Sequence, residues 1–105
     1  MSRQRMTYTE RLHQRFVLRA LRKANGSRCH WCSKPVRKSR NNLPSPMPHD
    51  IATLDHLKPR SHGGLTDTSN CVVACSACNT ERGSMSVEKW QAKLAERSSA
   101  EARAA

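Results

Sequence analysis

The sequence predicts a small α+β fold in which two short strands lie between helices near the two ends of the chain. Its 105 residues are enough for one domain. Apolar residues recur at helical spacing over residues 7–25. Two short β-tolerant segments, 52–57 and 71–74, are separated by a connection containing Pro59 and Gly63-Gly64. We therefore expect these segments to pair as a hairpin with helices packed around it.

The predicted N-terminal helix begins with a capping box. Thr7 fits the N-cap position, Glu10 fits the third helical position, and Asn25-Gly26 is a stop signal. Residues 1–6 are polar and basic and are expected to be flexible. The apolar residues that share one helical face, and that we expect to be buried, are Leu12, Phe16, Val17, Ala20, Leu21 and Ala24.

Two further helices are predicted in the C-terminal third. One or two helical turns over residues 77–82 are stopped by Gly83. A longer helix over residues 86–97 has Ser86 as its cap and Glu88 in its first turn, with Trp90 and Leu94 on one face. We expect residues 98–105 to fray, and residues 33–48, which contain four prolines, to form a loop.

The composition favours a nucleic-acid partner and excludes a large hydrophobic core. Lys and Arg number 19 against 8 Asp and Glu, which gives a formal net charge of +11. Leu, Ile, Val and Phe together account for 15 residues, too few for so charged a chain to fold by burial alone. Since neither a membrane span nor a secretory signal is visible, we expect a cytoplasmic protein.

Two Cys-x-x-Cys pairs supply the missing stabilisation. The first is Cys29-His30-Trp31-Cys32, and the second, 42 residues further on, runs from Cys75 to Cys78. Two such turns complete a tetrahedral shell of four thiolates, which predicts one structural Zn²⁺ per chain. A redox role would need a thioredoxin-like βαβ unit, which the sequence lacks. The fifth cysteine, Cys71, is expected to be a small core residue, and His30 and Trp31 are expected to pack over the metal site or the N-terminal helix.

Basic residues gather in places that could face DNA phosphates. Those on the predicted N-terminal helix are Arg11, Arg15, Arg19 and Arg22, and those in the loop after the first cysteine pair are Lys34, Arg37 and Lys38. Arg82, near the second pair, could contact phosphate or neutralise the end of its helix. The helix stripe could also be a solvated face, but the net charge favours phosphate contacts.

The segment between and after the cysteine pairs carries a constellation of residues that resembles the HNH endonuclease family. Its elements are Asp55-His56-Leu57-Lys58-Pro59, Ser61 with Gly63-Gly64, Asn70, and Cys75-x-x-Cys78-Asn79-x-x-Arg82. Each element alone is a weak signal, but their joint occurrence is specific. The resemblance covers residue 29 to about residue 83, half of the chain. The family's final His is Asn79 here, as in the H-N-N members of the family.

The resemblance implies a ββα-metal motif over residues 29–83 and a metal-dependent cleavage of DNA. It assigns catalysis to His56 as general base and to Asn70, which orients the loop carrying that base. Asp55 and Asn79 are expected to bind Mg²⁺ or Mn²⁺, since that ion prefers oxygen ligands. Because adjacent residues on a regular strand point to opposite faces, the strand must bend or end at Asp55 and His56.

The complete prediction is therefore one HNH domain over residues 7–97, flanked by a flexible N-terminus (1–6) and a frayed tail (98–105). The domain comprises the basic helix (7–25), the zinc-containing core (29–83) and the C-terminal helix (86–97). The chain looks most like phage or prophage enzymes, with DNA as partner, phage packaging or recombination proteins as further partners, and a monomer or weak dimer as its state. Two alternatives stay open: a non-catalytic zinc-stabilised nucleic-acid-binding module, and a zinc-stabilised adaptor for an acidic protein.

Overall fold

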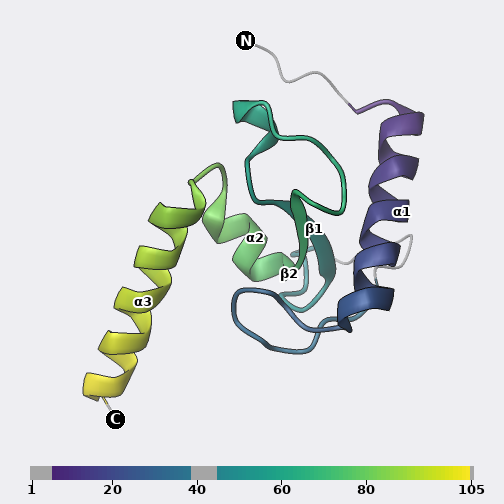
Figure 1. The fold of residues 1–105 in the computed structure, drawn as a ribbon. Coiled ribbons are helices and arrows are strands. Elements are labelled where there is room, and N and C mark those ends of the chain that lie inside the picture. Colours follow the sequence, from purple (N-terminus) through teal and green to yellow (C-terminus); the bar gives the residue numbers. More distant parts are fainter. Residues whose placement is uncertain (1–5, 39–44, 105) are drawn as a thin grey trace.

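A computed structural model describes residues 6–38 and 45–104 of the chain (Figure 1). Residues 1–5 of the predicted flexible N-terminus, residues 39–44 of the predicted loop and residue 105 lie outside the described part. The elements are α1 (Tyr8–Asn25), β1 (Ala52–His56), the short 3-10 helix η1 (Arg60–His62), β2 (Cys71–Cys75), α2 (Ser76–Arg82) and α3 (Val87–Ala104). This order confirms the predicted α+β class.

The two strands form the predicted antiparallel hairpin. Asp55 lies opposite Val72, and His56 lies opposite Cys71, in the register of the pair. β1 ends at His56, one residue earlier than predicted, and the N–H of Leu57 donates to the carbonyl of Asn70 at 2.7 Å. The end of β1 therefore coincides with the predicted site residues.

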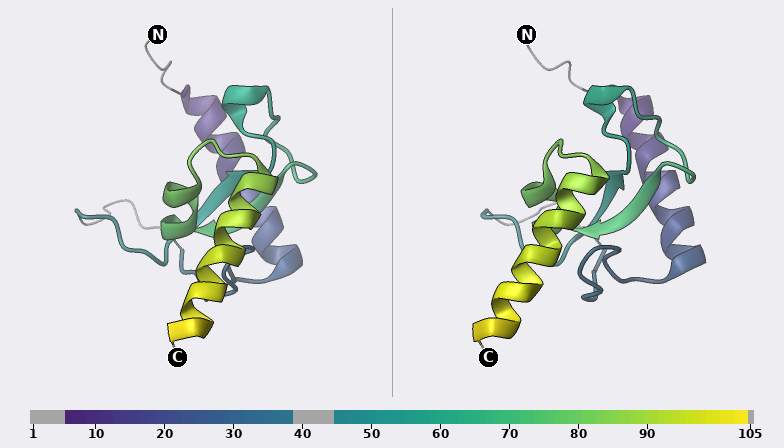
Figure 2. Two further views of the ribbon diagram at one scale, coloured as in Figure 1. Left: turned by 90° about the vertical axis from the view of Figure 1, so that its left-hand side faces the viewer. Right: turned by 60° about the vertical axis from the view of Figure 1, so that its left-hand side comes forward.

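Helices cover both sides of this hairpin. In Figure 1, α1 stands on one side and α2 on the other, and the turned views of Figure 2 keep the hairpin between α1 and α3. No helix of the described residues is long and apolar enough to cross a membrane. Because the sheet has two strands, each helix can bury a narrow stripe against it.

α1 begins as predicted but buries a different face. The capping box is present, with the Glu10 N–H donating to Thr7 Oγ1 at 3.1 Å. Val17 and Leu21 are buried, whereas Phe16 is 60% exposed, Leu12 is 36% exposed, and Ala20 and Ala24 are exposed as well, so the predicted buried face is wrong at these four positions. The reason is geometric: Phe16 is rotated by about 100° from Val17 around the helix. The narrow hairpin covers the Val17 side and leaves Phe16 in solvent.

α3 is longer than predicted. The Lys89 N–H donates to Ser86 Oγ at 3.2 Å, which confirms Ser86 as the cap. Trp90 is fully buried and meets the Trp31 ring edge-on, with centroids 6.4 Å apart. The helix continues to Ala104 rather than ending at residue 97, which corrects the prediction of a frayed tail. Residues 98–104 contain no Gly or Pro and include three alanines, the best helix former, so nothing stops the helix there.

Candidate functional site

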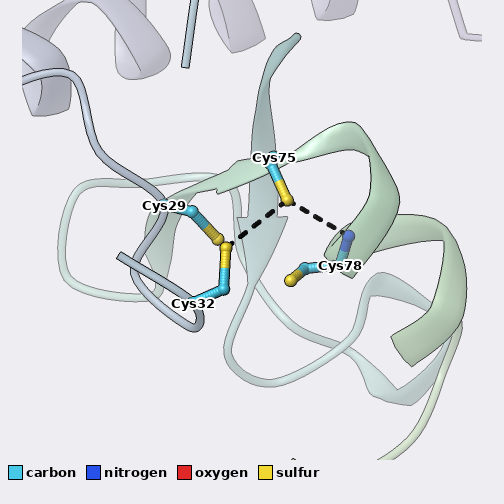
Figure 3. Close-up of side chains that lie close together, drawn as sticks. All are labelled: Cys29, Cys32, Cys75 and Cys78. Carbon is cyan, nitrogen blue, oxygen red and sulfur yellow. Dashed lines mark hydrogen bonds between the residues drawn. The ribbon is translucent and has the colours of Figure 1, made fainter. Parts of the chain in front are cut away.

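Four cysteines from three parts of the chain converge on one point (Figure 3). Cys29 and Cys32 belong to the turn after α1, Cys75 ends β2, and Cys78 lies in the first turn of α2. Their four Sγ atoms all lie within 4.8 Å of one another, and those of Cys32 and Cys75 are 3.9 Å apart. The N–H of His30 donates to the carbonyl of Val73 at 2.8 Å and ties the first turn to β2.

The geometry of this cluster fits a tetrahedral metal shell. Four sulfurs at the usual Zn–S distance of about 2.3 Å are about 3.8 Å apart. All four cysteines are free thiols here, and burial raises the pKa of Cys75 and of Cys78. A divalent cation would favour the thiolates that burial disfavours. The four cysteines are therefore positioned to bind a metal ion, as predicted.

A cleft of about 820 Å³ opens between the end of β1, the segment after it and α2. It brings together Asp55, His56 and Asn79, the residues to which the sequence assigns a second metal and the general base. Asp55 and His56 are neighbours, yet both line the cleft, because β1 ends there. The remaining lining residues are Leu54, Pro59, Arg60, Ser61, Thr80, Gly83 and Ser84.

Asp55 is buried, and its carboxylate accepts two strong hydrogen bonds. Its Oδ1 accepts from Arg82 Nη1 at 2.8 Å, and its Oδ2 accepts from Trp31 Nε1 at 2.7 Å. Each carboxylate oxygen has two lone pairs, so one on each oxygen stays free for a further partner. The orientation of the Asp55 carboxylate at the cleft is therefore fixed.

Arg82 is buried, which corrects the prediction that it contacts phosphate. Its side chain is fully inaccessible, and besides Asp55 it donates to the carbonyls of His56 at 2.9 Å, Leu57 at 2.6 Å and Met85 at 3.1 Å. Its guanidinium also lies 5.3 Å from the centre of the Trp31 ring. A charge so fully buried and paired cannot reach a phosphate in solvent, and its hydrogen bonds hold Asp55 and the end of β1.

His56 presents a neutral imidazole to the cleft. Burial lowers its pKa, the positive charge of Arg60 lowers it further, Asp55 opposes this, and Arg82 adds to the lowering. Nε2 lies 2.8 Å from the hydroxyl of Thr66. A ring that is uncharged at neutral pH can accept a proton, which is the chemistry expected of a general base.

Asn79, on α2, has a fixed orientation as well. Its amide nitrogen donates to Thr53 Oγ1 at 3.0 Å and to the carbonyl of Leu54 at 3.1 Å. Both amide hydrogens are thereby used, and Oδ1 has no hydrogen-bond partner within residues 6–38 and 45–104. The oxygen is the part of this side chain that can serve a ligand in the cleft.

Asn70 lies outside the cleft lining and fixes the segment that follows His56. Its Nδ2 donates to the carbonyls of Lys58 at 3.1 Å and Leu65 at 2.8 Å, and its Oδ1 accepts from the Lys58 N–H at 3.0 Å. Gly64 is required in this arrangement, since a Cβ there would lie 1.7 Å from the Lys58 carbonyl oxygen. Asn70 therefore holds the segment after His56 in place and does not line the cleft.

The predicted phosphate-binding residues are not brought together with the cleft. Arg11, Arg15 and Arg19 are exposed on α1, across the hairpin from α2 (Figure 1), and Arg22 is half-buried and donates to Ser27 Oγ at 3.2 Å. In the loop after the first cysteine pair, Lys34, Arg37 and Lys38 are exposed, and Arg37 pairs with Asp50 at 2.9 Å. The basic residues therefore form surfaces separate from the cleft.

Three interactions of the site were not visible in the sequence. Trp31 was expected to pack near the metal, but its N–H also orients Asp55. Thr66 contacts His56, and the carbonyl of Thr66 accepts from His13 Nε2 at 2.7 Å. His13 and Thr66 are 53 positions apart, so no local pattern could have paired them.

The comparison with protein-family models agrees with this geometry. No curated protein matches the chain. The model of the HNH endonuclease family matches residues 29–85, which include both cysteine pairs and every residue of the cleft. Since that match spans more than half of the 105 residues, the chain belongs to the HNH endonuclease family.

Proposed function

We propose that the protein is a metal-dependent endonuclease that nicks or cleaves DNA by hydrolysing phosphodiester bonds. The family implies a nucleic-acid substrate. The observation that supports the activity is the cleft at the end of β1, where Asp55, His56 and Asn79 line one open space. A module that only binds DNA has no need for the neutral imidazole of His56 beside the oriented oxygen atoms of Asp55 and Asn79.

His56 acts as the general base in this proposal. It accepts a proton from a water molecule, the resulting hydroxide bonds to phosphorus, and the bond from phosphorus to the leaving oxygen breaks, after which that oxygen takes a proton from solvent. Asp55 and Asn79 would hold Mg²⁺ or Mn²⁺, to which the free lone pairs of Asp55 and the Oδ1 of Asn79, unpartnered among the described residues, are suited. When bound, such an ion would supply positive charge that stabilises the transition state and the leaving oxygen. Asn70 keeps its role in orienting the segment after His56.

The four-cysteine cluster holds the second metal, one Zn²⁺ per chain, in this proposal. A shell of four thiolates leaves no open position for a substrate, so this ion is structural. Arg82 and Trp31 connect the two sites, since Trp31 lies within the first cysteine turn and both side chains hold Asp55.

DNA binding is assigned to the exposed basic residues. Arg11, Arg15 and Arg19 on α1 and Lys34, Arg37 and Lys38 contact phosphates without reading sequence, whereas the half-buried Arg22, also predicted for this role, contributes less. Because α1 lies across the hairpin from α2, its arginines bind DNA that flanks the cleft rather than the bond being cut. One cleft cuts one strand, so a double-strand break requires two chains or two visits.

The biological source, the cellular location, the partners and the oligomeric state belong to the same proposal. The family resemblance favours a phage or prophage enzyme in the cytoplasm of a bacterial host, with phage packaging or recombination proteins as further partners. A monomer or weak dimer is the expected state. We also propose the domain organisation given above, with the C-terminal helix extended to Ala104.

Replacing His56 tests the catalytic proposal. His56→Ala should lower plasmid cleavage in Mg²⁺ by at least about 10²- to 10⁴-fold, because the general base is lost. Zinc content, melting temperature and DNA affinity should stay near the wild-type values. His62→Ala, an exposed histidine in η1, is the matched control and should cleave like the wild type.

The same experiment separates the alternatives. A wild-type protein that binds DNA without cutting it supports the binding module, and one that does neither supports the adaptor. If His56→Ala cuts at the wild-type rate, the assignment of the base is wrong.

A further inference from the structure

His56 is held from outside its own strand by two hydrogen bonds in series. Its Nε2 lies 2.8 Å from Thr66 Oγ1, and the carbonyl of Thr66 lies 2.7 Å from His13 Nε2. A carbonyl can only accept, so His13 Nε2 carries the proton and donates it. His13 belongs to α1, outside the region 29–85 that the family model matches.

The first of these bonds bears on which nitrogen of His56 can act as a base, because the Thr66 hydroxyl can either accept from Nε2–H or donate to Nε2. A neutral imidazole carries one proton, on Nδ1 or on Nε2. When Nε2–H donates to Thr66 Oγ1, Nδ1 keeps its lone pair and can accept a proton from water. Nδ1 has no hydrogen-bond partner in the described part of the chain, and His56 is one of the residues that line the cleft.

The second hydrogen bond, from His13 to the Thr66 carbonyl, fixes the position of Thr66, which burial alone does not. Thr66 is half-buried, and its neighbour Leu65 is 70% exposed, so apolar packing does not fix this stretch. Asn70 holds the segment at Lys58 and Leu65 but does not hydrogen-bond to Thr66. His13 supplies the hydrogen bond at Thr66 itself and joins it to a rigid helix of 18 residues.

We propose that Thr66 and His13 are positioning residues of this endonuclease. Thr66 holds the proton of His56 on Nε2 and directs Nδ1 to the cleft, and His13 holds Thr66 in place from α1. α1 thereby takes part in the geometry of the active site, independently of its arginines. This inference rests on the proposed role of His56 as general base.

Substitutions at Thr66 test the first hydrogen bond. Thr66→Val keeps the size of the side chain but removes the hydroxyl, and it should lower kcat by about 10- to 100-fold with KM unchanged. Thr66→Ser retains the hydroxyl and should recover most of kcat. Thr68→Val is the matched control, because Thr68 is exposed in the same segment, and it should match the wild type.

Substitutions at His13 test the second hydrogen bond. His13→Ala should lower kcat and leave KM unchanged, whereas Lys23→Gln, at an exposed position of the same helix, should leave both kcat and KM unchanged. His13→Gln retains an N–H that can reach the Thr66 carbonyl and should recover part of kcat. Because both hydrogen bonds act through one path, His13→Ala combined with Thr66→Val should lower kcat no further than Thr66→Val alone.

Nitrogen-15 NMR of the His56 ring gives a readout independent of cleavage. At a pH where the ring is neutral, the wild type should show a protonated Nε2 and an unprotonated Nδ1, and Thr66→Val should show a mixture. Zinc content and melting temperature verify that each variant is folded. A wild-type ring protonated on Nδ1, or a Thr66→Val variant with wild-type kcat and spectrum, overturns the proposal. A wild-type protein that cuts no DNA overturns the proposed function instead, and the spectra then decide the positioning claim alone.

Discussion

The ion pair of Asp55 and Arg82 is the residue-scale feature on which the cleft depends most. Both side chains are buried, and in the described residues every hydrogen bond to the Asp55 carboxylate comes from Arg82 or Trp31. Removing one member of a buried pair leaves an uncompensated charge, which costs more than the pair itself contributes. Arg82 therefore affects both stability and the orientation of Asp55, without touching DNA.

Arg82→Met should lower the free energy of unfolding by about 3–5 kcal/mol, because it leaves Asp55 charged and buried. Chemical denaturation measures this change. Combining it with Asp55→Leu should recover part of the loss, since the orphaned charge is then removed. Arg97→Met is the control: it breaks the exposed pair of Arg97 with Glu81 and should barely move the denaturation midpoint. Equal losses for the two arginines would contradict the argument.

At the scale of elements, the segment between β1 and β2 can keep its backbone conformation only with a glycine at position 64. A Cβ at Gly64 would lie 1.7 Å from the Lys58 carbonyl oxygen and 3.0 Å from Asn70 Nδ2. Lys58 and Asn70 are the residues that close this segment through their hydrogen bonds. The glycine therefore allows the close approach on which the position of His56 depends.

Gly64→Ala should destabilise the fold by about 1–3 kcal/mol and lower cleavage, because the backbone at Lys58 must move. Gly26→Ala is a useful control: Gly26 has φ +87°, but nothing lies within 4 Å of its Cβ position. That variant should lose about 1 kcal/mol of stability and retain kcat. Thermal melts and single-turnover cleavage distinguish the two, and unchanged cleavage in Gly64→Ala would refute this role of the segment.

A second prediction at the scale of elements concerns DNA binding by the exposed arginines of α1. Arg15→Gln with Arg19→Gln should reduce the slope of log affinity against log salt by about 0.9 for each phosphate that the protein no longer neutralises. Arg22 is a poorer choice, since it is half-buried and donates to Ser27. Fluorescence anisotropy on duplex DNA at several salt concentrations measures the slope. An unchanged slope would mean that this stripe is a solvated face.

For the whole molecule, the four-cysteine cluster joins parts of the chain that are distant in the sequence. It connects the turn after α1, the end of β2 and the start of α2. The largest fully buried side chains of the described residues are Trp90 and Arg82, of which one is charged. With a core this small, a metal bound by these cysteines would supply a large share of the stability.

Removing zinc should unfold the protein. A strong chelator, or Cys75→Ser, should abolish the cooperative melt and the native circular dichroism, because binding energy at such sites is folding energy. Cys71→Ala, which removes a buried cysteine outside the cluster, should retain one zinc per chain by elemental analysis. A chelated sample that keeps its native melt would rule out the structural role.

The sequence alone determined the features that rest on local or repeated signals. The capping box of Thr7 and each Cys-x-x-Cys turn depend on spacing within a few residues, and the hairpin was predicted from two β-tolerant segments joined by a turning connection; the structure confirms all of them. The tertiary structure decided the rest. Whether Phe16 is buried depends on how wide the hairpin beneath it is, and whether Arg82 meets solvent depends on Asp55, 27 positions away. The link from His13 to His56 through Thr66 joins three segments that no sequence periodicity relates, because it exists only after α1 has packed on the hairpin.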